Sequence, residues 1–279
     1  MKLSQYRPPM SGSWRLRCLR ALLVLVLALG VSAVVLTQLD AQVRTPVGTA
    51  GVGRGAFPVV EVAGLGSTGT RFARLTTALQ RRGLTVLDFD PGRPGVQPLT
   101  YEPASNDEHI DDLAVRVVQP QIRAALERAH LPADQEVDVV AHSMGGLLMR
   151  YLIEKQPGWA AQVDDLVMVG TPNHGSSFIG WETRGGGPFS AVGADMEPGS
   201  TLLRSLGTTE PRTEVYTAIG GDPWQFRWLR YGRHGFDDTV PAESPFMTGA
   251  AIDTFPYLHG KLLLAAPVID LIVRTLTAE

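Results

Sequence analysis

The chain has 279 residues, of which 44% are hydrophobic and 19% charged, a balance typical of a globular rather than a disordered protein. This length suits one large α/β domain, or one such domain with a tail. The formal net charge is −3, and because positions 1–20 hold five basic and no acidic residues, residues 21–279 carry −8, which argues against a nucleic-acid partner. The single cysteine, Cys18, leaves the rest of the chain without disulfides or a thiolate metal site.

The first 40 residues have the pattern of an export signal or an N-terminal membrane anchor. The basic residues precede residues 21–36, a run without a charge, and this order is that of a signal with positive-inside orientation. Small residues at 31–33 suit cleavage by a signal peptidase, whereas residues 21–39 also reach the length of a short membrane span. Two alternatives stay open: secretion, or retention on the outer face of the cytoplasmic membrane. Residues 41–57 are predicted to be a linker.

Beyond the linker, strand and helix patterns alternate. Apolar runs bounded by turn residues predict strands at residues 58–65, 84–90, 137–141, 164–170 and 213–221. Apolar residues at helical spacing predict helices over residues 70–83, 109–130, 147–155 and 261–276. Pro120 should bend or divide the second of these helices. The segments 91–107 and 176–210 show no clear period, and the alternation as a whole indicates a parallel sheet with right-handed crossovers.

The stretch "VDVVAHSMGG", residues 137–146, ends an apolar strand at a serine flanked by small residues. Residues 141–145 match the nucleophile-elbow pattern G-x-S-x-G, with alanine in place of the first glycine. Small residues are needed there because the turn from strand to helix is so sharp that larger side chains would collide. Ligands collect at the carboxyl ends of parallel strands, and this turn would present Ser143 there, at the positive end of the following helix. We therefore interpret Ser143 as a nucleophile.

A serine nucleophile needs a base, and in such folds the order along the chain is serine, acid, histidine. Five of the six histidines fit poorly: two precede the serine, one adjoins it and should point elsewhere, one precedes any suitable acid, and one follows the fourth strand too closely. These are, in that order, His109 and His130, His142, His234, and His174. The remaining one, His259, lies just before the last predicted helix, where the base is expected.

The acid is expected in "GFDDTVP", residues 235–241, which offers Asp237 and Asp238. Only one of two adjacent carboxylates can face an imidazole, accept its Nδ1 proton and hold its tautomer. Spacing alone does not choose between them, and the alternative is that both are solvated loop acids.

Two backbone N–H donors are needed to stabilise the oxyanion of an acyl-transfer intermediate. One is expected from Met144, directly after the serine. The other is expected from Leu65, in the glycine-containing turn at residues 63–67 after the first strand, which could also be an ordinary tight turn. The residues indicate no cofactor and no metal site.

Several of these segments are similar to those of one known group of enzymes. "VDVVAHSMGGLLMRYLI" is close to the lipase elbow, and "LVMVGTPNHGS" is similar to the G-T-P-x-x-G-S segment that follows the next strand in lipases. "PVVEVAGLG" is similar to the strand that enters a His-Gly turn, with Ala63 in place of the histidine. "DMEPGSTLLRSL" and "YLHGKLL" are similar to the helix after the lid region and to the histidine segment. "FDDTVP" is similar to D-G-x-V-P, with Asp238 in the glycine position, which implies Asp237 as the acid.

By these segments, residues 58–279 resemble an α/β-hydrolase lipase, of the class of small secreted bacterial lipases and the lecithin:cholesterol acyltransferase-like group. The resemblance implies a mostly parallel central sheet with helices on both faces and a lid-like insertion. It also implies a serine hydrolase that cleaves esters through an acyl-enzyme on Ser143, Asp237 and His259, with Leu65 and Met144 at the oxyanion. The expected partners are an ester or lipid substrate and, as a candidate, a membrane surface; no oligomeric state is indicated.

Residues 176–236 have an aromatic and apolar character that suits a lid or an acyl groove, or else ordinary packing over the sheet. The side chains concerned are Phe178, Ile179, Trp181, Phe189, Trp224, Phe226, Trp228 and Leu229. Three alternatives to a lipase or esterase remain: an acyltransferase that uses the same residues, a non-catalytic binding protein on a hydrolase scaffold, and a peptidase, for which nothing suggests a peptide subsite.

Overall fold

The computed structural model describes residues 57–179, 189–207, 216–223 and 235–277. The predicted export segment, nearly all of the predicted linker and residues 213–215 of the fifth predicted strand lie outside these ranges. Within the described ranges, no helix combines the length and the apolar character needed to cross a membrane.

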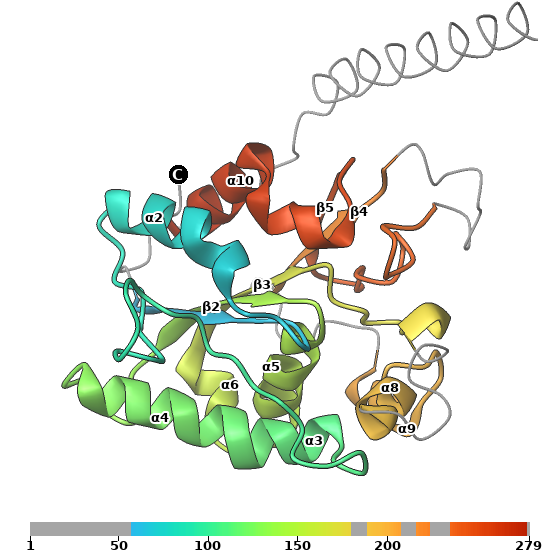
Figure 1. Ribbon diagram of the computed structural model, residues 1–279, viewed down its shortest axis with the longest axis horizontal. Coiled ribbons are helices and arrows are strands. Elements are labelled where there is room, and N and C mark those ends of the chain that lie inside the picture. The colour runs from blue at the N-terminus through green and yellow to red at the C-terminus, as the bar shows by residue number, and fades with distance from the viewer. Residues whose placement is uncertain (1–56, 180–188, 208–215, 224–234, 278–279) are drawn as a thin grey trace, which may run out of the picture. The chain divides into compact units, whose positions relative to one another are not determined.

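A parallel sheet lies at the centre of the described residues (Figure 1), as predicted. Its strands, in sheet order, are β1 (Val59–Val62), β2 (Val137–His142), β3 (Val163–Val169), β4 (Tyr216–Gly221) and β5 (Ala251–Phe255). Every neighbouring pair is parallel. The carboxyl ends of the strands therefore lie along one edge of the sheet, where ligands usually bind in this architecture.

Helices cover both faces of the sheet (Figure 1). One face carries α2 (Ala73–Arg81) and α10 (Ala266–Thr277), and the other carries α3 (Ile110–Leu113), α4 (Gln119–Arg128), α5 (Met144–Lys155) and α6 (Trp159–Gln162). Side chains alternate along β2, so that Val139 and Ala141 join the core under α4 and α5 whereas Val140 joins the core under α2 and α10. Both cores are apolar, which explains why the central strands read as continuous hydrophobic runs.

The prediction of a strand at residues 84–90 is wrong, although the segment does pair with the sheet. Thr85 and Leu87 exchange backbone hydrogen bonds with Val59, and the chain then turns away. The Asp88 carboxylate accepts the N–H groups of Asp90 and Gln97 and so closes this turn. Leu99, expected to be in a loop, returns to bond to Glu61 and Ala63. Two short bridges along β1 thus replace the expected strand.

The helix predicted over residues 109–130 is divided by Pro120, as expected. Between α3 and α4, the residues Ala114–Val118 form a π-helical segment. Proline lacks an N–H, and its ring clashes with the carbonyl of residue i−4, so the turn before it cannot keep regular α-helical bonding.

The C-terminal region differs from expectation in two ways. A 3₁₀ helix, η4 (His259–Leu264), precedes α10, which begins at Ala266 rather than at residue 261. Pro267 lies in the first turn of α10, where its missing N–H would have no partner within the helix. The strand β5 was not predicted, because "AIDTF" is partly exposed at the end of the described sheet and lacks an apolar run.

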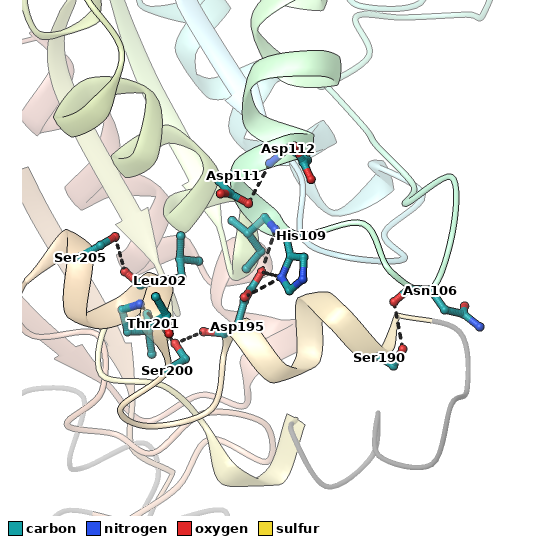
Figure 2. Close-up of polar contacts among 12 residues, drawn as sticks. Asn106, His109, Asp111, Asp112, Ser190, Asp195, Ser200, Thr201, Leu202 and Ser205 are labelled. Atoms are coloured by element: carbon teal, nitrogen blue, oxygen red, sulfur yellow. Dashed lines mark hydrogen bonds and ion pairs between the residues drawn. The ribbon is translucent and has the colours of Figure 1, made fainter.

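Two short helices, α8 (Ser190–Asp195) and α9 (Thr201–Leu206), lie within the predicted lid-like insertion. Asp195, the last residue of α8, accepts hydrogen bonds from His109 Nδ1 and the N–H of Ile110 at the start of α3 (Figure 2). At the other end of α8, Ser190 donates to the carbonyl of Asn106. We call this set of contacts the α8–α3 junction.

Of the aromatic and apolar side chains expected in a lid, five lie outside the described residues: Trp181, Trp224, Phe226, Trp228 and Leu229. Ile179 is buried in the core, Phe189 packs against it, and Phe178 makes an edge contact with Phe236 at 5.5 Å between ring centroids. The described members of the set therefore pack against the domain.

Candidate active site

Ser143 stands between β2 and α5 in a backbone conformation that residues other than glycine rarely adopt. Its φ is 55° and its ψ is −130°, and its N–H donates to the carbonyl of Val169 at the end of β3. A conformation of this kind costs about 1–3 kcal/mol and persists only where the surroundings enforce it. This is the sharp strand-to-helix turn that the sequence predicted.

The glycines after Ser143 are required by packing. A Cβ on Gly145 would lie 2.6 Å from the carbonyl oxygen of Ala63, at the end of β1. A Cβ on Gly146 would overlap the hydroxyl of Thr171, in the loop after β3. The elbow is therefore wedged between its two neighbouring strands, and this confirms the need for small residues at these positions.

His259 and Asp237 are brought together at the same edge of the sheet. His259 Nδ1 lies 3.0 Å from Asp237 Oδ2, and the N–H of His259 donates to the carbonyl of Asp237. The other carboxylate oxygen, Oδ1, accepts the N–H groups of Thr239 and Val240. Asp237 is 1% exposed, so its charge is stabilised by these donors rather than by water. A carboxylate only accepts, so His259 Nδ1 carries a proton and Nε2 is left as the basic nitrogen.

Asp238, the alternative acid, occupies a different position. Its φ is 81°, which explains why glycine stands here in the D-G-x-V-P pattern and why aspartate, which tolerates this region, can replace it. Its carboxylate accepts the Thr239 hydroxyl. Burial raises the pKa of Asp238, opposed by this hydrogen bond, and the charge of Asp237 raises it further. Residue spacing alone did not choose between Asp237 and Asp238. In the structure, His259 pairs with Asp237.

The end of β3 brings Ser143 and His259 to the same place. The carbonyl of Val169 accepts the N–H of Ser143. The next residue, Gly170, has φ 65°, and a Cβ on it would lie 3.0 Å from the His259 ring. The serine and the imidazole are thus positioned by two consecutive residues of one strand end.

The two predicted oxyanion residues lie on either side of this edge. Met144 is the first residue of α5, where backbone N–H groups have no partner within the helix. Leu65 is in the turn after β1, where the N–H of Ser67 bonds to the carbonyl of Gly64. Gly64 approaches the nucleophile closely, since a Cβ on it would lie 3.0 Å from Ser143 Cβ. The turn therefore lies against the serine, as an oxyanion loop would.

Sequence reasoning missed Arg150, a fully buried cation on α5. Its guanidinium donates to the carboxylate of Glu154, to the side-chain carbonyl of Asn173 and to the carbonyl of Leu206 at the end of α9. The side-chain amide of Asn173 in turn donates to the carbonyl of Pro245. The arginine thus ties the helix after the nucleophile to the loop after β3 and to α9. An arginine at helical spacing among apolar residues was the available signal.

The loop after β3 also holds the segment that carries the acid. Ser176 donates to the carbonyl of Thr239, two residues after Asp237. Ser244 donates to the carbonyl of Gly175, and its own carbonyl accepts the N–H of His174. The G-T-P-N-H-G-S segment therefore positions the acid through its small polar residues, whereas His174 is an exposed residue.

Among the residues that the structure describes, one group of carboxylates has metal-ligand spacing. Single oxygens of Asp138, Asp164 and Asp165 lie within 4.8 Å of one another. These residues stand at the start of β2 and β3, at the end of the sheet opposite Ser143. They take no part in the site around Ser143.

Comparison with known proteins identifies the fold. A family profile described as a domain of unknown function (DUF7379) matches residues 69–182, and no curated protein matches the chain. The mature lipase BlEst2 of Bacillus licheniformis is 16% identical with a TM-score of 0.61, over 82% of this chain and 96% of its own. Phospholipase PlaB of Legionella pneumophila is 18% identical with a TM-score of 0.61, over 80% of this chain and 60% of its own. The chain has the α/β-hydrolase fold.

Lipase B of Aspergillus fumigatus, 15% identical with a TM-score of 0.53, matches over 83% of this chain and 55% of its own. At such identities the likeness extends to the fold alone, which a variety of activities share. The activity has to be argued from the side chains at the strand ends.

Proposed function

We propose that the protein is a carboxylic ester hydrolase that works through an acyl-enzyme on Ser143. The observation that carries this proposal is the pairing of His259 Nδ1 with the buried Asp237 carboxylate beside a serine held at φ 55°. These are the parts of an activated serine nucleophile: a hydroxyl on a nucleophile elbow, an imidazole whose Nδ1 is fixed by a hydrogen bond, and a carboxylate that accepts several hydrogen bonds.

In the proposed reaction, His259 Nε2 takes the proton of the Ser143 hydroxyl as Oγ attacks the ester carbonyl. Asp237 stabilises the imidazolium that forms and keeps its tautomer. The N–H groups of Met144 and Leu65 stabilise the oxyanion. His259 then gives its proton to the leaving alcohol. It later takes a proton from the water that cleaves the acyl-enzyme, and it returns that proton to Ser143 Oγ as the acid product leaves.

We further propose that the substrate is lipid-like. Support comes from the predicted export segment at residues 1–40 and from the aromatic character of residues 176–236. BlEst2 and Lipase B are described as lipases and PlaB as a phospholipase. These three observations favour apolar esters at the cell envelope over small soluble ones.

The test is hydrolysis of p-nitrophenyl esters from acetate to palmitate by the full-length protein, with Ser143→Ala as the blank. A rate that rises with acyl length supports a lipase, and a rate confined to short acyl chains supports an esterase without a lipid groove. A wild-type rate equal to that of the blank contradicts ester hydrolysis. Addition of a long-chain alcohol then tests acyl transfer, because transfer would appear as a new ester.

A further inference from the structure

His142, the residue before the nucleophile, points toward the base. The residue is 2% exposed, and the centroid of its ring lies 4.7 Å from that of the His259 ring. Alternation along β2 explains this direction, because His142 shares a face with Val140, the face that carries α10 and the segment starting at His259. The sequence analysis excluded His142 as the catalytic base and assigned it no other role.

The ring makes one defined hydrogen bond. His142 Nε2 lies 3.2 Å from the backbone carbonyl oxygen of His259. A carbonyl can only accept, so Nε2 carries the proton. Burial lowers the pKa of His142 well below its ordinary value, as do the charges of His259 and Arg71, so the ring stays neutral and keeps this single tautomer near pH 7.

The opposite nitrogen faces the other side of the site. A Cβ on Gly64 would lie 3.0 Å from His142 Nδ1 and equally close to Ser143 Cβ. The imidazole therefore spans from the turn that carries Leu65 to the backbone of His259. Because it is covalently next to Ser143, its bond to His259 links the strand that holds the nucleophile to the segment that holds the base.

The two hydrogen bonds between His259 and Asp237 do not provide this link. Its N–H and its Nδ1 both bond to Asp237, and they fix the imidazole relative to the acid. Gly170 limits its ring from the side of β3. The hydrogen bond from His142 joins His259 directly to the residue that precedes the nucleophile.

We propose that His142 is a positioning residue that holds His259 at the correct distance from Ser143 by donating its Nε2 proton to the His259 carbonyl. This inference rests on the proposed function. The donor carries no charge and touches no reacting atom, so its loss should slow the chemical step while substrate binding is retained. Small displacements of a catalytic group cost about 100-fold in rate.

The test compares three variants of the full-length protein with p-nitrophenyl butyrate as the probe. In His142→Gln the side-chain nitrogen is the same number of bonds from the backbone as Nε2 and can still donate. His142→Leu has a similar volume without a donor, and His142→Asn has the same amide one bond too short. We expect kcat to fall about 100-fold in the Leu and Asn variants and less than about fivefold in the Gln variant, with KM within about threefold throughout.

Melting temperatures of all variants are measured alongside, and if His142→Leu fails to fold, the Gln and Asn pair decides. A wild-type kcat in the Asn variant, or equal losses in the Gln and Asn variants, would overturn the positioning role. A wild-type protein that hydrolyses no ester would overturn the proposed function itself, and the inference with it.

Discussion

The candidate active site around Ser143 and the α8–α3 junction are each centred on a carboxylate, but the two carboxylates have different partners. Asp237 is buried and accepts from two backbone N–H groups in addition to His259. Asp195 accepts from one backbone N–H and from His109, whose side chain is 51% exposed. Backbone N–H donors do not titrate, and their hydrogen bonds depend little on salt. The active site should therefore keep its geometry under conditions that loosen the junction.

The difference is also visible in the protonation of the junction. Burial raises the pKa of Asp195, and the hydrogen bond to Asp195 raises the pKa of His109. Asp111 and Asp112, at the start of α3, raise the pKa of His109 further. The junction that anchors α8 is therefore sensitive to pH.

The largest effect is expected from a substitution of Asp237, the carboxylate of the active site. Asp237→Asn should lower kcat/KM about 10⁴-fold, because the amide cannot hold the Nδ1–H tautomer of His259. The matched control is Asp238→Asn, at a position whose φ of 81° asparagine tolerates, with an expected loss below about tenfold. Kinetics with a p-nitrophenyl ester decide, and the reverse ranking would show that Asp238 is the acid.

Glu61 on β1 extends the comparison to a carboxyl that, among the described residues, has neither a backbone donor nor a cation. It is fully buried, it bonds to the Thr76 hydroxyl, and burial raises its pKa to about 8. A raised pKa in the folded state means that its contribution is fully present below pH 4.5 and is lost as the pH rises through 8.

We therefore expect wild-type stability to fall relative to Glu61→Gln by up to about 5 kcal/mol between pH 4.5 and pH 9, from 1.36 kcal/mol per pKa unit. Urea unfolding of both proteins across this range measures the difference. Parallel curves for the two proteins would mean that Glu61 is ionised in the folded state at neutral pH.

Arg150 lies outside the α8–α3 junction and joins α5, the helix after the nucleophile, to the end of α9. Arg150→Met should cost about 3–5 kcal/mol in unfolding free energy, because it leaves the Glu154 carboxylate, whose side chain is 6% exposed, without its cation. The control is Lys155→Met, which removes an exposed bond to the carbonyl of Ser205 and should cost less than about 1 kcal/mol. Denaturant unfolding gives both values, and similar costs would argue against a buried network.

The smallest effect is expected at the α8–α3 junction itself. The stabilisation from protonated His109 is fully present below pH 6.5 and is lost as the pH rises through its raised pKa. Between pH 6 and pH 9, the amide of Ile110 should lose protection in hydrogen exchange by less than about 1 kcal/mol, discounted for the exposure of His109. The amide of Leu203, which bonds to the Ser200 hydroxyl, is the reference. His109→Gln should remove the pH dependence, and its persistence in that variant would assign it to another group.

The parts of the fold that could be predicted from the sequence are those with a strong local signal. The buried strands β2 and β3 and the break at Pro120 were predicted because apolar runs and proline act locally. The strand β5 and the paired residue Leu99 were not, because their pairing depends on neighbours far along the chain. The order serine, acid, histidine located the candidate site, whereas the choice between Asp237 and Asp238 needed either a family resemblance or coordinates.

The contacts of the positioning groups could not be predicted for a related reason. His142, Arg150 and Asn173 act through hydrogen bonds to backbone carbonyls. Every residue has a backbone carbonyl, so the sequence does not indicate which one accepts the hydrogen bond. Their side chains alone are compatible with surface positions or with ordinary packing.

The strained backbone of Ser143 lowers the stability of the fold but places the hydroxyl that the proposed activity needs. Glycine adopts φ 55° without the penalty that a side chain pays there, so Ser143→Gly should unfold at a higher temperature than Ser143→Ala, although neither can form an acyl-enzyme. Selection for stability alone would favour glycine at this position. A serine kept there therefore indicates that the protein gives up some of its folding free energy to hold a hydroxyl at the edge of its sheet.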